Sequence, residues 1–120
     1  MQKAFVLLDV RHNWLSDITI KLEPQIGNAP FSVIDLITRR GDNGHNFEKT
    51  IISSTCSKSL PNTSAGAPFE DCYRPEPPYD SLAGLNGKNP VGTWILKASD
   101  IDTSVYGTVN SWSAIMCVVP

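Results

Sequence analysis

Two neighbouring stretches, GTWILKASD at residues 92–100 and GTVNSW at residues 107–112, decide the fold class. In the first, Trp94 and Leu96 fall on one side of an extended chain and their neighbours on the other. This two-residue period is typical of a strand with one buried face. The second stretch places Trp112 on a following strand. Two large indoles on consecutive strands indicate the core of a β-sandwich.

Most of the remaining chain shows the same alternation, with turn residues in between. The expected strands cover residues 5–12, 17–22, 31–38, 47–52, 79–85, 92–99 and 108–119. Pro24 is assigned to the turn after the second strand. Five prolines restrict residues 53–78 to loops and edge strands, because proline cannot donate to a ladder. About eight short strands, with no helical period, predict an all-β, antiparallel β-sandwich of jelly-roll type.

Length and charge limit the class of protein. The 120 residues form a single expected domain, residues 1–120, large enough for its own core. A net charge of −2 supplies no basic surface, so we expect no nucleic-acid partner. No apolar run approaches the ~18 residues that cross a bilayer, so no membrane insertion is expected. The apolar run at residues 4–8 is too short for a signal peptide and reads as a strand.

The three cysteines leave two interpretations open. No Cys-x-x-Cys pair is present, which argues against a zinc site. Cys56 and Cys72 flank a loop, and a disulfide between them would contribute ~3 kcal/mol. The alternative is that these two and Cys117 are reduced, partly buried thiols.

A colinear series of short motifs resembles the P domain (P/Homo B domain) of subtilisin-like proprotein convertases and their bacterial relatives. The series covers nearly the whole chain. The matching residues are His12 and Trp14, Asp17 to Leu22 with Pro24, Gly44 to Phe47 with Thr50, Pro68-Phe69, Tyr73, Pro75, Leu82, Gly84, Gly92 to Leu96, Asp100, Gly107 to Val109 and Trp112.

Some positions depart from the family pattern. Family members usually have another strand or two before the histidine turn, so we expect part of that edge to be absent or replaced. Cys72 stands where the family often has glycine, and Ser53-Ser54 replaces a usually acidic pair. The turn at residues 14–17 fits a bacterial-type relative better than an animal convertase.

The resemblance implies a function and a location. Such a domain is a non-catalytic accessory module of a secreted, kexin/furin-type serine endopeptidase. It packs against the subtilisin-like protease domain and supports that domain's folding, stability and regulation by calcium and pH. The expected location is extracellular or in the secretory pathway. The alternative is a stand-alone adhesion module that binds protein or carbohydrate in a secreted or surface protein.

The sequence offers little for catalysis. A serine-protease triad needs a base beside its nucleophile, and only His12 and His45 could serve. No Gly-x-Ser-x-Gly elbow surrounds any serine. We interpret His12 as bonding nearby backbone and His45 as an exposed loop residue. The domain alone is expected not to be an enzyme.

Four aspartates are the candidate metal ligands. Asp17, Asp42, Asp100 and Asp102 fall at strand ends or turns, and carboxylate oxygens suit calcium. Asp100 and Asp102 form the best pair, since one residue separates them. The competing interpretation, which we prefer, is that each aspartate caps its own turn.

Three further patterns have a structural and a functional interpretation. Residues 39–42, Arg-Arg-Gly-Asp, read as a strand end entering a loop rather than as an adhesion or processing motif. Asn62-Thr63-Ser64 is a glycosylation acceptor by pattern, in an expected loop. Trp94 and Trp112 are expected in the core rather than on sugar rings, whereas Trp14, in a turn, is the better candidate for an exposed contact.

Overall fold

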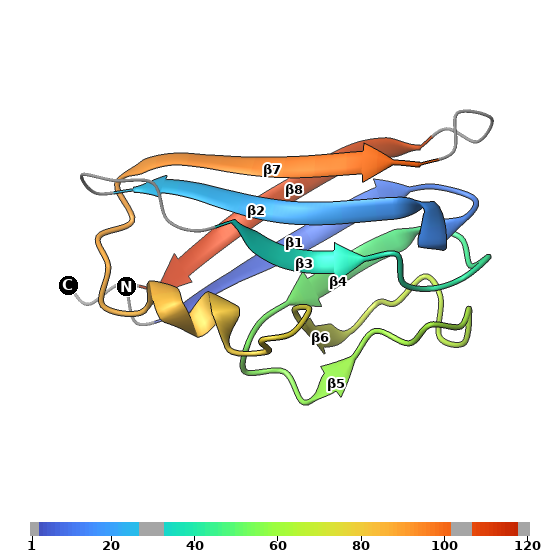
Figure 1. Ribbon diagram of the computed structural model, residues 1–120, viewed down its shortest axis with the longest axis horizontal. Coiled ribbons are helices and arrows are strands. Elements are labelled where there is room, and N and C mark those ends of the chain that lie inside the picture. Colours follow the sequence, from blue (N-terminus) through green and yellow to red (C-terminus); the bar gives the residue numbers. More distant parts are fainter. Residues whose placement is uncertain (1–2, 27–32, 102–106, 118–120) are drawn as a thin grey trace.

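The computed structural model describes residues 3–26, 33–101 and 107–117. These residues form two stacked β-sheets and two short 3-10 helices (Figure 1). The elements are β1 (Lys3–Arg11), η1 (Leu15–Asp17), β2 (Ile18–Ile26), β3 (Ile34–Thr38), β4 (Phe47–Ile52), β5 (Lys58–Ser59), β6 (Cys72–Arg74), η2 (Ser81–Leu85), β7 (Gly92–Asp100) and β8 (Thr108–Cys117). No helix in this part of the chain is long and apolar enough to cross a membrane.

The larger sheet has the strand order β5-β6-β4-β1-β8, and the smaller has β3-β2-β7. The chain passes between the two sheets several times, and its last two strands lie in different sheets: β7 ends the smaller sheet and β8 the larger. The prediction of an all-β sandwich with about eight strands is confirmed. The long strands pair antiparallel, whereas the short β6 runs parallel to both β4 and β5. Parallel pairing is possible there because a long crossover, residues 53–71, separates β4 from β6.

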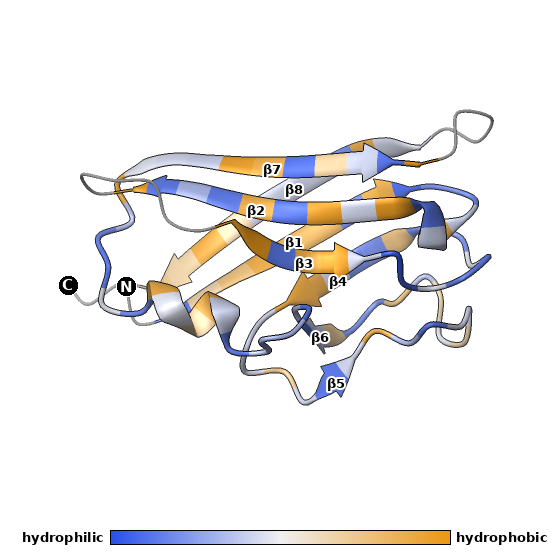
Figure 2. Ribbon diagram, in the orientation of Figure 1, coloured by the Kyte–Doolittle hydropathy of each residue, from blue (hydrophilic) through white to orange (hydrophobic). Residues whose placement is uncertain are grey.

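The alternating pattern buries one face of each central strand. In β1 the side chains of Val6 and Leu8 are almost fully buried, and in β2 the same holds for Ile20 and Leu22. Hydrophobic and hydrophilic residues alternate along β2, as its orange and blue bands show (Figure 2). Burying such a side chain contributes about 1.5–3 kcal/mol, so this alternation determines which face of each sheet turns inward.

The aromatic core differs from the one expected. Phe47 and Phe69 are fully buried with ring centroids 5.6 Å apart, and Tyr73 meets Phe69 edge-on at 5.9 Å. Trp94 and Trp112 pack against the core but are only partly buried. The prediction that both indoles lie inside is therefore half right. Their strands are the last in each sheet, and a sheet edge leaves one flank of each side chain uncovered.

The segment expected as a brief strand at residues 79–85 is instead the helix η2. Leu82 and Leu85 are its buried residues. A 3-10 helix turns once every three residues, so side chains at i and i+3 lie on one side. This spacing lets both leucines cover the end of the core beside β1.

Pro24 lies within β2, not in a turn after it. It pairs with Trp94 of β7, and β2 continues to Ile26. Among the described residues, β2 pairs with β3 from Thr19 to Leu22. Proline has no N–H, so Pro24 can accept but cannot donate a hydrogen bond in its pairing with β7. The other residues assigned to that turn lie outside the described residues.

A disulfide joins Cys56 to Cys72, with Cα atoms 5.6 Å apart. It ties the irregular segment after β4 to the start of β6. This settles the two interpretations of these cysteines in favour of the disulfide. Cys117, at the end of β8, is a free and exposed thiol.

Candidate functional site

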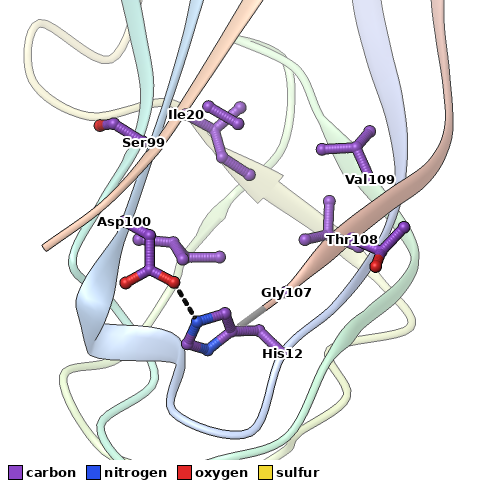
Figure 3. Close-up of a pocket in the computed structure, with 10 residues that line it drawn as sticks. His12, Ile20, Ser99, Asp100, Gly107, Thr108 and Val109 are labelled. Atoms are coloured by element: carbon purple, nitrogen blue, oxygen red, sulfur yellow. Dashed lines mark hydrogen bonds and ion pairs between the residues drawn. The ribbon is translucent and has the colours of Figure 1, made fainter. Parts of the chain in front are cut away.

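Three of the motifs noted in the sequence meet at one end of the sandwich. His12 follows β1, Asp17 ends η1 just before β2, and Asp100 ends β7. His12 is buried, Asp17 is partly buried and Asp100 is exposed, and the pairing of Ile18 with Asp100 brings the ends of η1 and β7 together. One ligand atom from each lies within 4.8 Å of the others. Figure 3 shows His12 and Asp100 joined across the space between the sheets.

The imidazole of His12 is held at both nitrogens. Its side chain is 1% exposed, and Nε2 lies 2.7 Å from Oδ2 of Asp100. The backbone N–H of Trp14 donates to Nδ1 at 2.9 Å. Because Nδ1 accepts that bond, the proton of a neutral ring sits on Nε2 and is donated to the Asp100 carboxylate. The sequence predicted the bond to nearby backbone, and this is confirmed.

The backbone of His12 is fixed as firmly as its ring. Its N–H donates to Oδ1 of Asn46 at 2.9 Å, and its carbonyl accepts from the Asn46 N–H at 2.9 Å. Asn46 has a positive φ of 66°, a conformation that asparagine tolerates better than most residues. The motif from Gly44 to Phe47 therefore positions the histidine turn.

Gly107 lies directly against the imidazole. A Cβ at this position would come within 2.4 Å of Cδ2 of His12 and 2.7 Å of the Arg11 carbonyl oxygen. Both distances are far below van der Waals contact. The glycine that precedes β8 is thus required by the close approach of the chain to His12.

The donor set favours an oxygen-loving ion over zinc. A zinc ion on Nε2 would need the lone pair there, which moves the ring proton to Nδ1, opposite the Trp14 N–H donor. Calcium binds oxygen ligands and could use the carboxylates of Asp17 and Asp100 while His12 keeps its hydrogen bond. The hydrogen bonding of His12 thus argues against zinc on Nε2, and the carboxylates of Asp17 and Asp100 are the two candidate calcium ligands that the structure brings together.

The four predicted carboxylates do not all gather. Asp17 and Asp100 come together, as just described. The side chain of Asp42 is exposed and is not in that group, although its carbonyl accepts from the Ser16 N–H at 3.0 Å. Asp102, the predicted close partner of Asp100, lies outside the described residues. Among the described residues, the carboxylate beside Asp100 comes from Asp17 at the end of η1.

A cavity of about 220 Å³ opens between the sheets beside this cluster. Its walls come from β1, β2, β7 and β8, and most of them are apolar, including Ile18 and Ile20. His12 and Asp100 form its polar end (Figure 3). The cavity could take a small apolar group, with the carboxylate at one end favouring a positive charge.

The arrangement around His12 does not resemble a hydrolase triad. A general base needs Nε2 free to receive the proton of a nucleophile. Here Nε2 faces Asp100, and in the described part of the chain the recorded ring contacts go to Asp100 and Trp14. His45 is exposed in a loop, as predicted.

The Arg-Arg-Gly-Asp segment enters a loop at the end of β3, as predicted. Arg40 forms a forked ion pair with Glu76, 2.7 Å at the shortest, and donates to Oδ1 of Asn62 at 2.6 Å. The hydrogen bond to Glu76 raises the pKa of Arg40 above its ordinary value. Gly41 is buried with a φ of 92°, and its N–H donates to the Pro61 carbonyl. Arg40, the second arginine of the segment, is therefore held in place by Glu76 and Asn62.

Two surface residues lie as expected. Trp14 is 45% exposed in the turn after β1. Asn62 is exposed in the loop before β6.

The sequence analysis missed the bond between His12 and Asp100. These residues are 88 positions apart. They come together because β2, which follows the histidine turn and η1, pairs with β7 so that Ile18 lies opposite Asp100. One signal was present: both residues belong to the colinear motif series, and both stand at strand ends.

No family model, no curated protein and no solved structure matches this chain. The case for a family therefore rests on the residues and their arrangement.

Proposed function

We propose that this chain is a non-catalytic β-sandwich module of the P-domain type, accompanying a subtilisin-like serine endopeptidase domain in a secreted protein. One observation supports it most. Four separate pieces of the motif series supply His12, Asp17, Asp100 and Gly107, which meet at a single site. Motifs that resemble a family only by chance would have no reason to interlock.

The interlocking explains why these residue types recur together. Asp100 accepts the proton of His12, Gly107 leaves room for the ring, and the Asn46 side chain holds the turn. If one partner of a buried, charge-assisted hydrogen bond is removed, the other partner is left buried without a hydrogen bond, and the folded state is destabilised. The module's stability therefore depends on His12, Asp100, Gly107 and Asn46 together, which is a structural role and requires no reaction.

In this proposal the module acts by mass action. It binds the folded protease domain and not the unfolded one, so it stabilises the protease by its binding free energy. Calcium held by Asp17 and Asp100 would add stability at the loop end of the sandwich. The disulfide between Cys56 and Cys72 suits the oxidising compartment that a secreted protein passes through.

The test begins with the gene that encodes this chain. An adjoining region encoding a subtilisin-type Asp, His and Ser triad is expected. The protease region would then be produced with and without the module, and its melting temperature and activity half-life compared. Loss of the module should lower both. An adjoining adhesin repeat or surface anchor, or a protease indifferent to the module, would contradict the proposal and favour the adhesion alternative.

A further inference from the structure

One long side of the sandwich is open. β7 ends the smaller sheet and β8 ends the larger, so both are edge strands on the same border of the two-sheet topology; in Figure 1 β8 begins near the end of β7 and then runs obliquely behind β2. Within the described ranges, β7 pairs only with β2, and β8 only with β1. We call this border, formed by residues 92–100 and 107–117, the open side.

Residues that face inward on these two strands stay exposed. Ala98 lies opposite the fully buried Ile20, so its side chain points between the sheets, yet it is exposed. Val109, opposite the buried Val10, is 38% exposed. Trp94, Leu96, Trp112 and Met116 are only partly buried. The core is therefore incomplete along the open side, and the 220 Å³ cavity lies at one end of it.

The edge of β8 has neither charge nor proline to protect it against pairing, and its one register shift against β1 lies between Asp9 and Val10, near the start of β8. Soluble proteins shield a long edge with lysine, proline or a very short strand. β8 is ten residues long, TVNSWSAIMC, and contains neither a charged residue nor a proline. An exposed, uncharged strand edge of this length is a template for another strand.

We propose that the open side pairs with the open side of a second copy of this chain. The two β8 strands would run antiparallel across a two-fold axis and join the larger sheets into one. Each copy then presents the same surface to the other, as a two-fold interface requires. The inward residues of both copies would share one core.

Charge favours a second copy as the occupant. In antiparallel pairing across a two-fold axis, residues near the axis meet their own copies and residues at one end of β8 meet those at the other end, so a strand carrying charges of one sign would repel its copy. β8 carries no charge at all. On β7, Lys97 is already paired with Glu23, and Asp100 with His12. The pairing thus brings together no unpaired like charges.

The dimensions are also sufficient. Ten residues at about 3.4 Å each, by two sheets about 10 Å apart plus their outward side chains, give a strip of roughly 600 Å² per copy. Specific interfaces bury about 600–1,000 Å² per partner, so the open side lies at the lower end of that range.

The test measures the mass of the chain in solution. Sedimentation velocity would be run from about 1 to about 100 µM, where a moderate dimer dissociates and forms. A Cys117→Ser background prevents disulfide-linked pairs through the exposed thiol. We expect the mass to rise to twice that of the monomer, with a blue shift of tryptophan fluorescence as Trp94 and Trp112 become covered.

A charged variant tests the surface. Ser111 and Ser113 are exposed on the outer face of β8, and pairing centred on Trp112 would set each opposite the other's copy. In Ser111→Lys/Ser113→Lys the like charges should raise the dissociation constant at least about tenfold. Ser57→Lys/Ser64→Lys adds the same charge at exposed loop positions on the far edge of the larger sheet, and should dimerise like the parent.

Hydrogen exchange keeps the test decisive if the lysine variant fails to fold. Amide protection along β8 of the parent chain should rise with protein concentration, while protection along β4 should not change. If the chain stays monomeric at all concentrations and the β8 amides exchange rapidly, the proposal is overturned. The edge of β8 would then be available to pair with a strand of another protein. A dimer equally stable in both lysine variants overturns the proposal too.

Discussion

At the scale of single residues, His12 organises the end of the molecule. Its ring accepts from Trp14 and donates to Asp100, and its backbone is bonded to Asn46 on both sides. Burying an imidazole costs little folding free energy when both ring nitrogens are hydrogen-bonded. Removing either partner leaves a buried nitrogen without a hydrogen bond and destabilises the fold. The neighbouring residue types are therefore tightly constrained.

Gly107→Ala should destabilise the chain by about 3 kcal/mol, because its methyl would meet both the His12 ring and the Arg11 carbonyl. Urea unfolding measures this loss. Gly87→Ala is the control: no atom lies within 4 Å of its added methyl, and only the positive φ of 84° is penalised, by about 1 kcal/mol. Equal losses in the two variants would show that Gly107 is not packed against His12.

Calcium should raise the melting temperature by several degrees if Asp17 and Asp100 bind it, because an ion bound only by the folded state stabilises that state. Asp17→Asn should abolish the rise while leaving the bond between His12 and Asp100 intact. Asp42→Asn should keep the rise, since its carboxylate is not in the cluster. Differential scanning calorimetry with calcium and with a chelator gives the answer, and an unchanged melt of the parent chain would rule out the site.

At the scale of elements, the spacing of apolar residues along the sequence distinguishes strands from helices. The strands β1 and β2 alternate strictly, and both were predicted within a few residues of their ends. The segment of η2 has apolar residues at Leu82 and Leu85, a spacing of three that strand prediction could not use. The proline-rich surroundings favoured a short extended piece, and tertiary burial of both leucines decided for the helix.

Leu82→Ala should cost about 2–4 kcal/mol, because it empties a fully buried site at the end of the core. Ala83→Ser is the matched change at the next, exposed position, and should alter stability by less than about 0.5 kcal/mol. Thermal unfolding of both variants separates the two outcomes. If the segment were a loosely attached strand, the two changes would have similar, small effects.

At the scale of the whole molecule, the core is lopsided. Phe47, Phe69 and Tyr73 fill the side near β4 and β6, and the disulfide closes over the same region. The opposite side, along β7 and β8, is covered only in part. A sandwich with one closed and one open side has apolar surface left for association.

Trp94→Ala should cost about 1–3 kcal/mol and Phe69→Ala about 3–5 kcal/mol, because only the second ring is fully buried. Trp94 also loses its N–H bond to the Pro90 carbonyl, which is 3.0 Å long. Guanidinium unfolding at low protein concentration, where the chain is monomeric, measures the difference. Equal losses would mean that the open side is closed in the monomer.

The sequence by itself determined the all-β class and the inward faces of most strands. Alternation and turn chemistry are local properties, and burial of Val6, Leu8, Ile20 and Leu22 follows from them. It also singled out His12, Asp17 and Asp100 as notable residues.

Only the tertiary structure decided which of these residues meet and which aromatic rings are buried. The bond from His12 to Asp100 spans 88 positions, and it exists because β7 lies beside β2 rather than beside β8. The indoles of Trp94 and Trp112 stay half-covered because their strands end the two sheets. Strand order is set by long-range pairing, and a period read along the chain holds no information about which strand will be the last.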